Sequence, residues 1–74
     1  MDRNEWIEGF ARELEVEPPT EKEVEEILDL AAIAAHASER TAAPVACWIG
    51  GRVGRPLDEL IGAAKRAAGD ETQG

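Results

Sequence analysis

The stretch from Thr20 to Thr41 constrains the fold of this chain more than any other. Between Leu28 and Ala37 only Asp29 and His36 are polar. A helix that is apolar around most of its circumference is usually buried on several sides. Its small alanine side chains also allow neighbouring helices to approach closely, because interaxial distance depends on the side chains at the contact. The stretch therefore predicts a central helix on which the other elements pack.

The start of this helix is marked by a capping signal. Thr20 is a good N-cap residue, and Glu23 lies three positions later, as a capping box requires. Apolar and small residues then recur at helical spacing, which predicts one inward face with Leu28 in the core. The residues of that face are Val24, Ile27, Leu28, Ala31, Ala34, Ala35 and Ser38.

Three further helices are predicted around the central one. The first covers Arg3 to Glu15, capped by Asn4 or Asp2, and its stripe of Trp6, Phe10 and Leu14 is spaced by four. We expect both tryptophans, Trp6 and Trp48, to lie in the core.

The third helix is predicted to follow a turn over residues 41–44, with Pro44 at its first position. One face of this helix carries Val45, Trp48, Ile49 and Val53. Gly50 and Gly51 could soften or end the helix early, and Gly54 is expected to end it. A fourth begins near Pro56. No stretch alternates with period two, so the predicted fold class is all-α, a compact four-helix bundle with a central alanine-rich helix.

Length and cysteine content narrow the class of protein. The 74 residues predict one helical domain over residues 1–69, followed by a disordered tail over 70–74. Cys47 is the only cysteine, so no disulfide forms within the chain, and a lone thiol fits a reducing cytoplasm. One cysteine and one histidine cannot fill a zinc site, and we expect no metal and no cofactor. No signal peptide or membrane-spanning run is predicted, which also favours a cytoplasmic protein.

The charge is large and unevenly distributed. Eight basic and sixteen acidic residues give a net charge of −8, which should repel nucleic acid and anionic membranes. Residues 1–26 carry ten acidic and three basic residues, whereas residues 41–69 carry four basic and two acidic ones. A solvated acidic surface is the favoured interpretation. The alternative is a dipolar protein that presents one face to a partner.

Several short motifs carry a family resemblance. They are Asn4-Glu5-Trp6-Ile7, Leu28-Asp29-Leu30-Ala31, Ala35-His36, Glu39-Arg40 and Ala42-Ala43-Pro44. Over roughly residues 4–68 the chain resembles a small helical family of unknown function from actinobacteria. Thr41 and Cys47-Trp48 depart from the family pattern.

Members of that family occur alone, or as C-terminal extensions of proteins similar to molybdenum cofactor guanylyltransferase. The resemblance implies a non-catalytic accessory role in molybdenum cofactor biosynthesis or molybdoenzyme maturation. The implied partner is a guanylyltransferase-like enzyme or a molybdoenzyme. No residue inherits a catalytic role from the family, and we expect no enzyme activity.

Four residues are candidates for ligand binding. His36 and Arg40 share a helix face, and Arg52 and Arg55 lie in a glycine-containing segment before a helix start, where backbone N–H groups attract anions. The alternative function is therefore a small anionic ligand or nucleotide bound by His36, Arg40, Arg52 and Arg55. The favoured interpretation of His36 is structural, as a side chain that bonds the 41–44 turn. Cys47 lies between apolar residues and is expected to pack against other side chains. The shortage of polar residues argues against a stand-alone hydrolase. The chain is expected to be a monomer or a weak homodimer.

Overall fold

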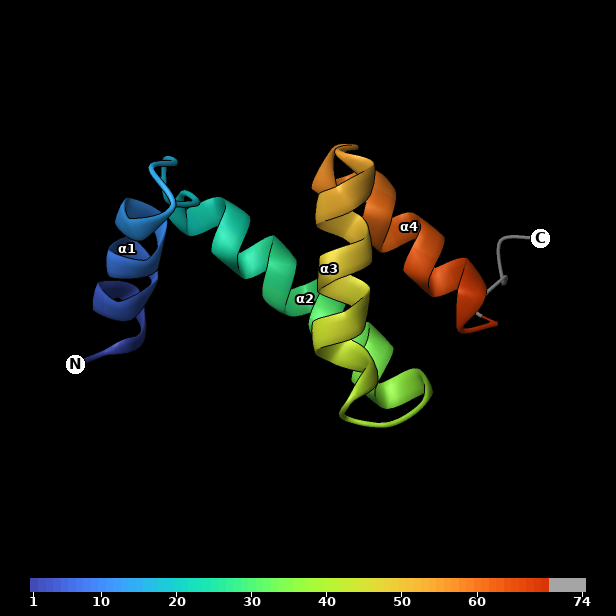
Figure 1. Ribbon diagram of the computed structural model, residues 1–74. Helices are drawn as coiled ribbons and strands as arrows, with labels where there is room; N and C mark the ends of the chain where they lie inside the picture. Colours follow the sequence, from blue (N-terminus) through green and yellow to red (C-terminus); the bar gives the residue numbers. More distant parts are fainter. Residues whose placement is uncertain (70–74) are drawn as a thin grey trace.

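Four helices make up the part of the chain that the structure, a computed structural model, describes, residues 1–69. They are α1 (Arg3–Glu13), α2 (Glu21–Ala37), α3 (Ala42–Val53) and α4 (Leu57–Ala67), and Figure 1 shows them in order. No strand occurs within residues 1–69, so the prediction of an all-α, four-helix fold is confirmed. The tail predicted over 70–74 lies outside the described residues.

The helix starts follow the local sequence chemistry. In α2 the Glu23 backbone N–H donates to Thr20 Oγ1 over 3.1 Å, and the Thr20 N–H donates to Glu23 Oε1 over 2.8 Å. This confirms the predicted capping box. In α1 the cap is Asp2, which forms a second capping box with Glu5. Both boxes satisfy backbone donors that have no partner inside the helix.

Two helix boundaries differ from the prediction. The first helix ends at Glu13, and Glu15 takes a left-handed conformation at φ 59° that turns the chain away from the helix axis. The third helix starts at Ala42, two residues before Pro44. Proline is tolerated there because the N–H groups of the first turn have no helical acceptor. Gly54, at φ 73°, ends α3 as predicted.

The core lies between α2, α3 and α4. Helix α2 packs against both α3 and α4, as expected for the central helix. Leu30 is only 5% exposed, whereas Leu28, predicted to be in the core, is 49% exposed. The two residues point about 200° apart around a helix, so they face nearly opposite directions. The apolar circumference of α2 did not specify which side α3 and α4 would cover, and they cover the Leu30 side.

Helix α1 stands apart from this three-helix body. Figure 1 shows it beside the start of α2, away from α3 and α4. It makes no contact with another helix comparable to those that α2 makes, and it extends the molecule to 42 × 23 × 19 Å. Trp6 of α1 and Trp48 of α3 are 56% and 62% exposed, so the prediction that both lie in the core is wrong. No helix within residues 1–69 covers these two side chains.

None of the four helices within residues 1–69 is long and apolar enough to cross a membrane.

Candidate functional site

The first pair of candidate ligands lies at the turn between α2 and α3. His36 near the end of α2 and Arg40 in the turn are both exposed. No hydrogen bond joins His36 to the 41–44 turn in the part of the chain described, so the proposed fastening role of His36 is wrong. Backbone groups close the turn instead. The Ala42 and Ala43 N–H groups donate to the carbonyl oxygens of Glu39 and Arg40 over 2.9 and 3.1 Å.

The second pair lies at the opposite end of α3. Arg52 is in the last turn of this helix, and Arg55 is in the connection to α4. At 1.5 Å per residue, the helix rises about 15 Å from Ala42, its first residue, to Arg52, and Arg40 lies before that start. The structure therefore brings His36 near Arg40 and Arg52 near Arg55, but it does not bring the four candidates together around one small ligand.

Arg52 is engaged by an aromatic side chain. Its guanidinium carbon lies 4.8 Å from the centroid of the Trp48 ring, which is a cation–π distance. The contact holds an indole and a guanidinium side by side on the outside of α3. Both groups are exposed, so the pair is available to a second molecule.

A cavity of about 310 Å³ opens between α2, α3 and α4. Leu30, Leu60 and Cys47 contribute apolar surface to it, and Arg55 contributes the one charged side chain of its lining. Burial raises the pKa of the Cys47 thiol, so the unreactive protonated form is favoured. A protonated thiol beside one arginine supplies neither a nucleophile–base pair nor an acid–base pair. The cavity offers mainly apolar contact, with one arginine in its lining.

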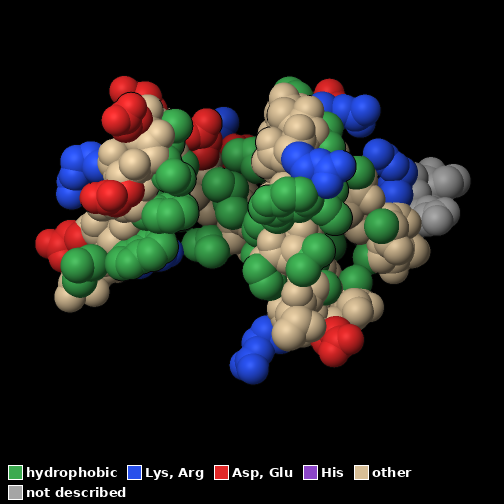
Figure 2. Space-filling model, viewed as in Figure 1, with side chains coloured by type: hydrophobic (Ala, Val, Ile, Leu, Met, Phe, Trp, Pro, Cys, Tyr) green, Lys and Arg blue, Asp and Glu red, His purple; other side chains and the backbone are tan. Residues whose placement is uncertain are grey.

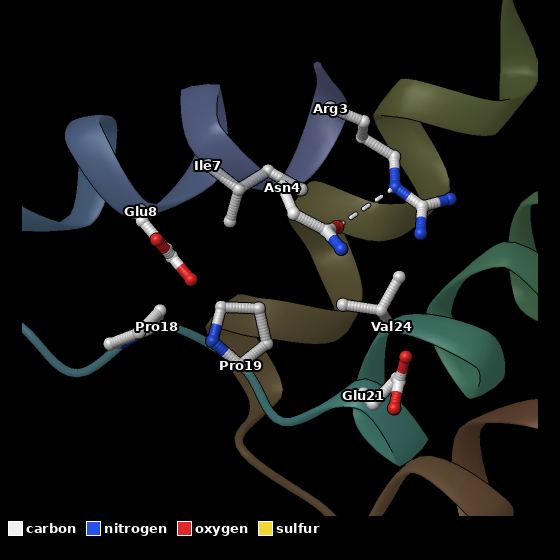
Figure 3. A pocket seen from close by; sticks show the side chains of 8 residues that line it. All are labelled: Arg3, Asn4, Ile7, Glu8, Pro18, Pro19, Glu21 and Val24. Carbon is white, nitrogen blue, oxygen red and sulfur yellow. Dashed lines mark hydrogen bonds between the residues drawn. The ribbon is translucent and has the colours of Figure 1, made fainter. Parts of the chain in front are cut away.

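A smaller cavity of about 170 Å³ marks the seam between α1 and α2 (Figure 3). Ile7 of α1, Pro19 of the connection and Val24 of α2 line it together with charged side chains at its edge. Arg3 Nε donates to Asn4 Oδ1 over 3.3 Å, the dashed line in Figure 3. This small seam is the region through which α1 meets the rest of the molecule.

The described residues, 1–69, contain no group of three or more His, Cys, Asp or Glu side chains that could hold a metal ion. They also contain no buried side-chain nitrogen or oxygen without a hydrogen-bond partner.

Two exposed apolar faces dominate the surface instead. The first, here called the α1 face, consists of Trp6, Phe10 and Leu14, which are 52–57% exposed. Trp6 and Phe10 stack, with ring centroids 5.1 Å apart and planes inclined by 20°. Figure 2 shows hydrophobic side chains gathered over α1 and over α3 on one side of the molecule.

The second, the α3 face, lies on the outside of α3. It consists of Val45, Trp48, Ile49 and Val53, which are 48–62% exposed. These residues follow the spacing of one helix face. The sequence identified both stripes through this spacing, but spacing alone does not distinguish a face covered by the same chain from one left open.

Comparison with known proteins identifies one family model over most of the chain. The family described as "Domain of unknown function (DUF6457)" matches residues 1–73. No curated protein and no solved structure matches the chain.

Proposed function

The chain belongs to the DUF6457 family of domains of unknown function, and from this premise we propose that it is a non-catalytic accessory domain that binds a partner protein. The exposed α3 face carries the proposal. Large exposed apolar patches on small domains usually mark interaction sites. Trp48 and Arg52 are residue types that dominate binding energy at protein interfaces, and here they are already stacked on each other.

The charge around the α3 face supports the kind of partner proposed. Residues 41–69 carry a net charge of +2, in contrast to the strongly acidic residues 1–26. A complementary partner surface would have an apolar recess for Trp48, bordered by carboxylates that pair with Arg52. Such a partner is recognised by shape and charge, without chemistry at the domain itself.

The family resemblance supports the identity of the partner. The chain resembles actinobacterial domains that also occur as C-terminal extensions of proteins similar to molybdenum cofactor guanylyltransferase. The proposed partner is therefore a guanylyltransferase-like enzyme that lacks such an extension. The other proposed partner is a molybdoenzyme that receives its cofactor from that enzyme. The place of action proposed is the cytoplasm, where the thiol of Cys47 stays reduced.

Calorimetric titration of the domain into such an enzyme tests the proposal. Trp48→Ala should weaken binding at least tenfold, because it removes the largest exposed side chain of the α3 face. His36→Ala is the matched control, since His36 is exposed and lies outside this face. Circular dichroism checks that both variants fold.

The opposite pattern would contradict the proposal. If His36→Ala abolished binding while Trp48→Ala left it intact, the α3 face would not be the docking surface. That result would favour the alternative, a small anionic ligand held near His36 and Arg40. This alternative has less support, because the His36–Arg40 and Arg52–Arg55 pairs are separated by the length of α3.

A further inference from the structure

Helix α1 makes few contacts with the other helices of residues 1–69, although its Ala11 is only 6% exposed. It has 11 residues, and isolated helices shorter than about 12–15 residues are marginal in water. Gly9 in its interior lowers its helix propensity by about 1 kcal/mol relative to alanine. In proteins a short helix is stabilised mainly by covering its apolar face, yet the α1 face is more than half exposed. A second molecule that covered it would supply the missing stabilisation.

The surface area of the chain points the same way. The accessible surface of the 74-residue chain is 5880 Å². A folded monomer of 8.0 kDa is expected to expose about 4,450 Å². The excess of about 1,400 Å² is spread over the whole chain, and the open α1 and α3 faces both contribute to it. The radius of gyration, 13.4 Å, also exceeds the value of about 11 Å expected for this length.

The charges beside the α1 face identify the occupant. Arg3, Trp6, Phe10 and Glu13 are separated by three, four and three residues, so their backbone positions share one side of the helix. The exposed Arg3 side chain donates to Asn4 Oδ1 beside the α1–α2 cavity and must turn away from it to reach a second copy. If a second α1 lies antiparallel on this side, Trp6 of each copy faces Phe10 of the other. Arg3 of each copy then faces Glu13 of the other, at both ends of the pair. In this arrangement each charged residue faces a residue of opposite charge on the antiparallel copy. The helix face is then complementary to itself, as a two-fold symmetric interface requires.

We propose that a second copy of this chain covers the α1 face, in a symmetric dimer whose two α1 helices lie antiparallel. The aromatic side chains provide the affinity. The two Arg3–Glu13 pairs set the register, because exposed ion pairs contribute little binding energy but do select a partner's orientation. The inference does not depend on the proposed function, which uses the α3 face on a different helix.

The net charge gives this dimer a distinctive salt dependence. Two copies at −8 each repel one another over long distances, and salt screens that repulsion. Added salt should therefore tighten self-association. A basic protein bound to the acidic residues 1–26 would show the opposite dependence, because salt would screen an attraction.

Sedimentation equilibrium of the full chain, from low micromolar to near-millimolar concentration, tests the proposal. We expect a monomer–dimer equilibrium that shifts towards dimer with added salt. Trp6→Glu should leave a monomer throughout, and Phe10→Ala should weaken the dimer at least tenfold. Trp48→Ala is the matched control and should dimerise like the wild type. At a dilution where the wild type is also monomeric, both variants should keep its helix content by circular dichroism, because Trp6 and Phe10 are exposed.

A charge exchange tests the antiparallel register. Arg3→Glu alone and Glu13→Arg alone should each weaken the dimer several-fold, and the double variant should recover wild-type affinity. A wild-type chain that stays monomeric at every concentration would overturn the proposal. A dimer lost with Trp48→Ala but kept with Trp6→Glu would overturn it too, and so would a double variant that failed to recover. A dimer that depended on Trp48 would also place a second copy on the α3 face and so count against the proposed function. The other two results concern the α1 face alone, so the two proposals can fail separately.

Discussion

Leu30 is the side chain on which the core depends most. It is 5% exposed on α2, and it contacts the surface that α3 and α4 place over that side of the helix. Leu30→Ala should lower the free energy of unfolding by about 2–5 kcal/mol, because it removes buried methyl groups and leaves a cavity. Urea denaturation followed by circular dichroism measures the loss. Since small domains have little stability to spare, the variant could be unfolded at ambient temperature.

Two variants on the same helix serve as controls. Leu28→Ala should cost much less than Leu30→Ala, because Leu28 is 49% exposed. His36→Ala should leave the free energy of unfolding nearly unchanged, since the His36 side chain is exposed and forms no hydrogen bond within residues 1–69. Equal losses for Leu28→Ala and Leu30→Ala would show that the inward side of α2 is wrongly assigned.

These residues also show where sequence reasoning was limited. The Thr20–Glu23 box was predictable because a cap is a matter of side chains three residues apart. The choice between Leu28 and Leu30 was not, because both sides of α2 are apolar and only the packing of α3 and α4 distinguishes them. The glycine at the end of α3 was predictable for a local reason as well, since Gly54 takes a positive φ.

At the scale of the elements, Gly50 sets how closely α3 packs. A Cβ atom at Gly50 would lie 3.0 Å from Leu60 Cδ1 and 3.6 Å from Leu30 Cδ2, whereas at Gly51 it would meet nothing within 4 Å. The sequence suggested that these glycines could soften or end the helix, yet α3 continues through both. Gly50 instead permits the close contact of α3 with α2 and α4.

The two neighbouring glycines form a matched pair of tests. Gly51→Ala should raise the free energy of unfolding by up to about 1 kcal/mol, because alanine favours the helix and the site is open. Gly50→Ala should forfeit most or all of that gain, since Leu60 must move to admit the new methyl group. Thermal and urea denaturation of both variants gives the difference. If Gly50→Ala were as stabilising as Gly51→Ala, close packing at this glycine would not limit stability.

The candidate site was only partly predictable at this scale. Helical spacing correctly grouped Trp6 with Phe10, and Trp48 with Ile49. It could not show that these stripes would be exposed, because burial depends on whether another element reaches them. The four candidate ligands were separated for a similar reason. His36 is near the end of α2, beside the start of α3, whereas Arg52 is in the last turn of α3.

At the scale of the whole molecule, residues 1–69 form two parts. Helices α2, α3 and α4 form a packed body, and α1 joins it through the small seam around Ile7, Pro19 and Val24. The number of helices followed from breakers and periodicity. The position of α1 did not, because it depends on a small free-energy difference between covering its aromatic face within the chain and leaving it for a second molecule.

Hydrogen–deuterium exchange measured helix by helix tests this division most directly. At a dilution where the chain is monomeric, the amides of α1 should exchange much faster than those of α2 around Leu30, because few tertiary contacts oppose local opening of α1. Raising the protein concentration should slow exchange in α1 and leave α2 nearly unchanged. Amides of α1 that were as protected as those of α2 in the dilute monomer would contradict the account, because α1 would then belong to the packed body.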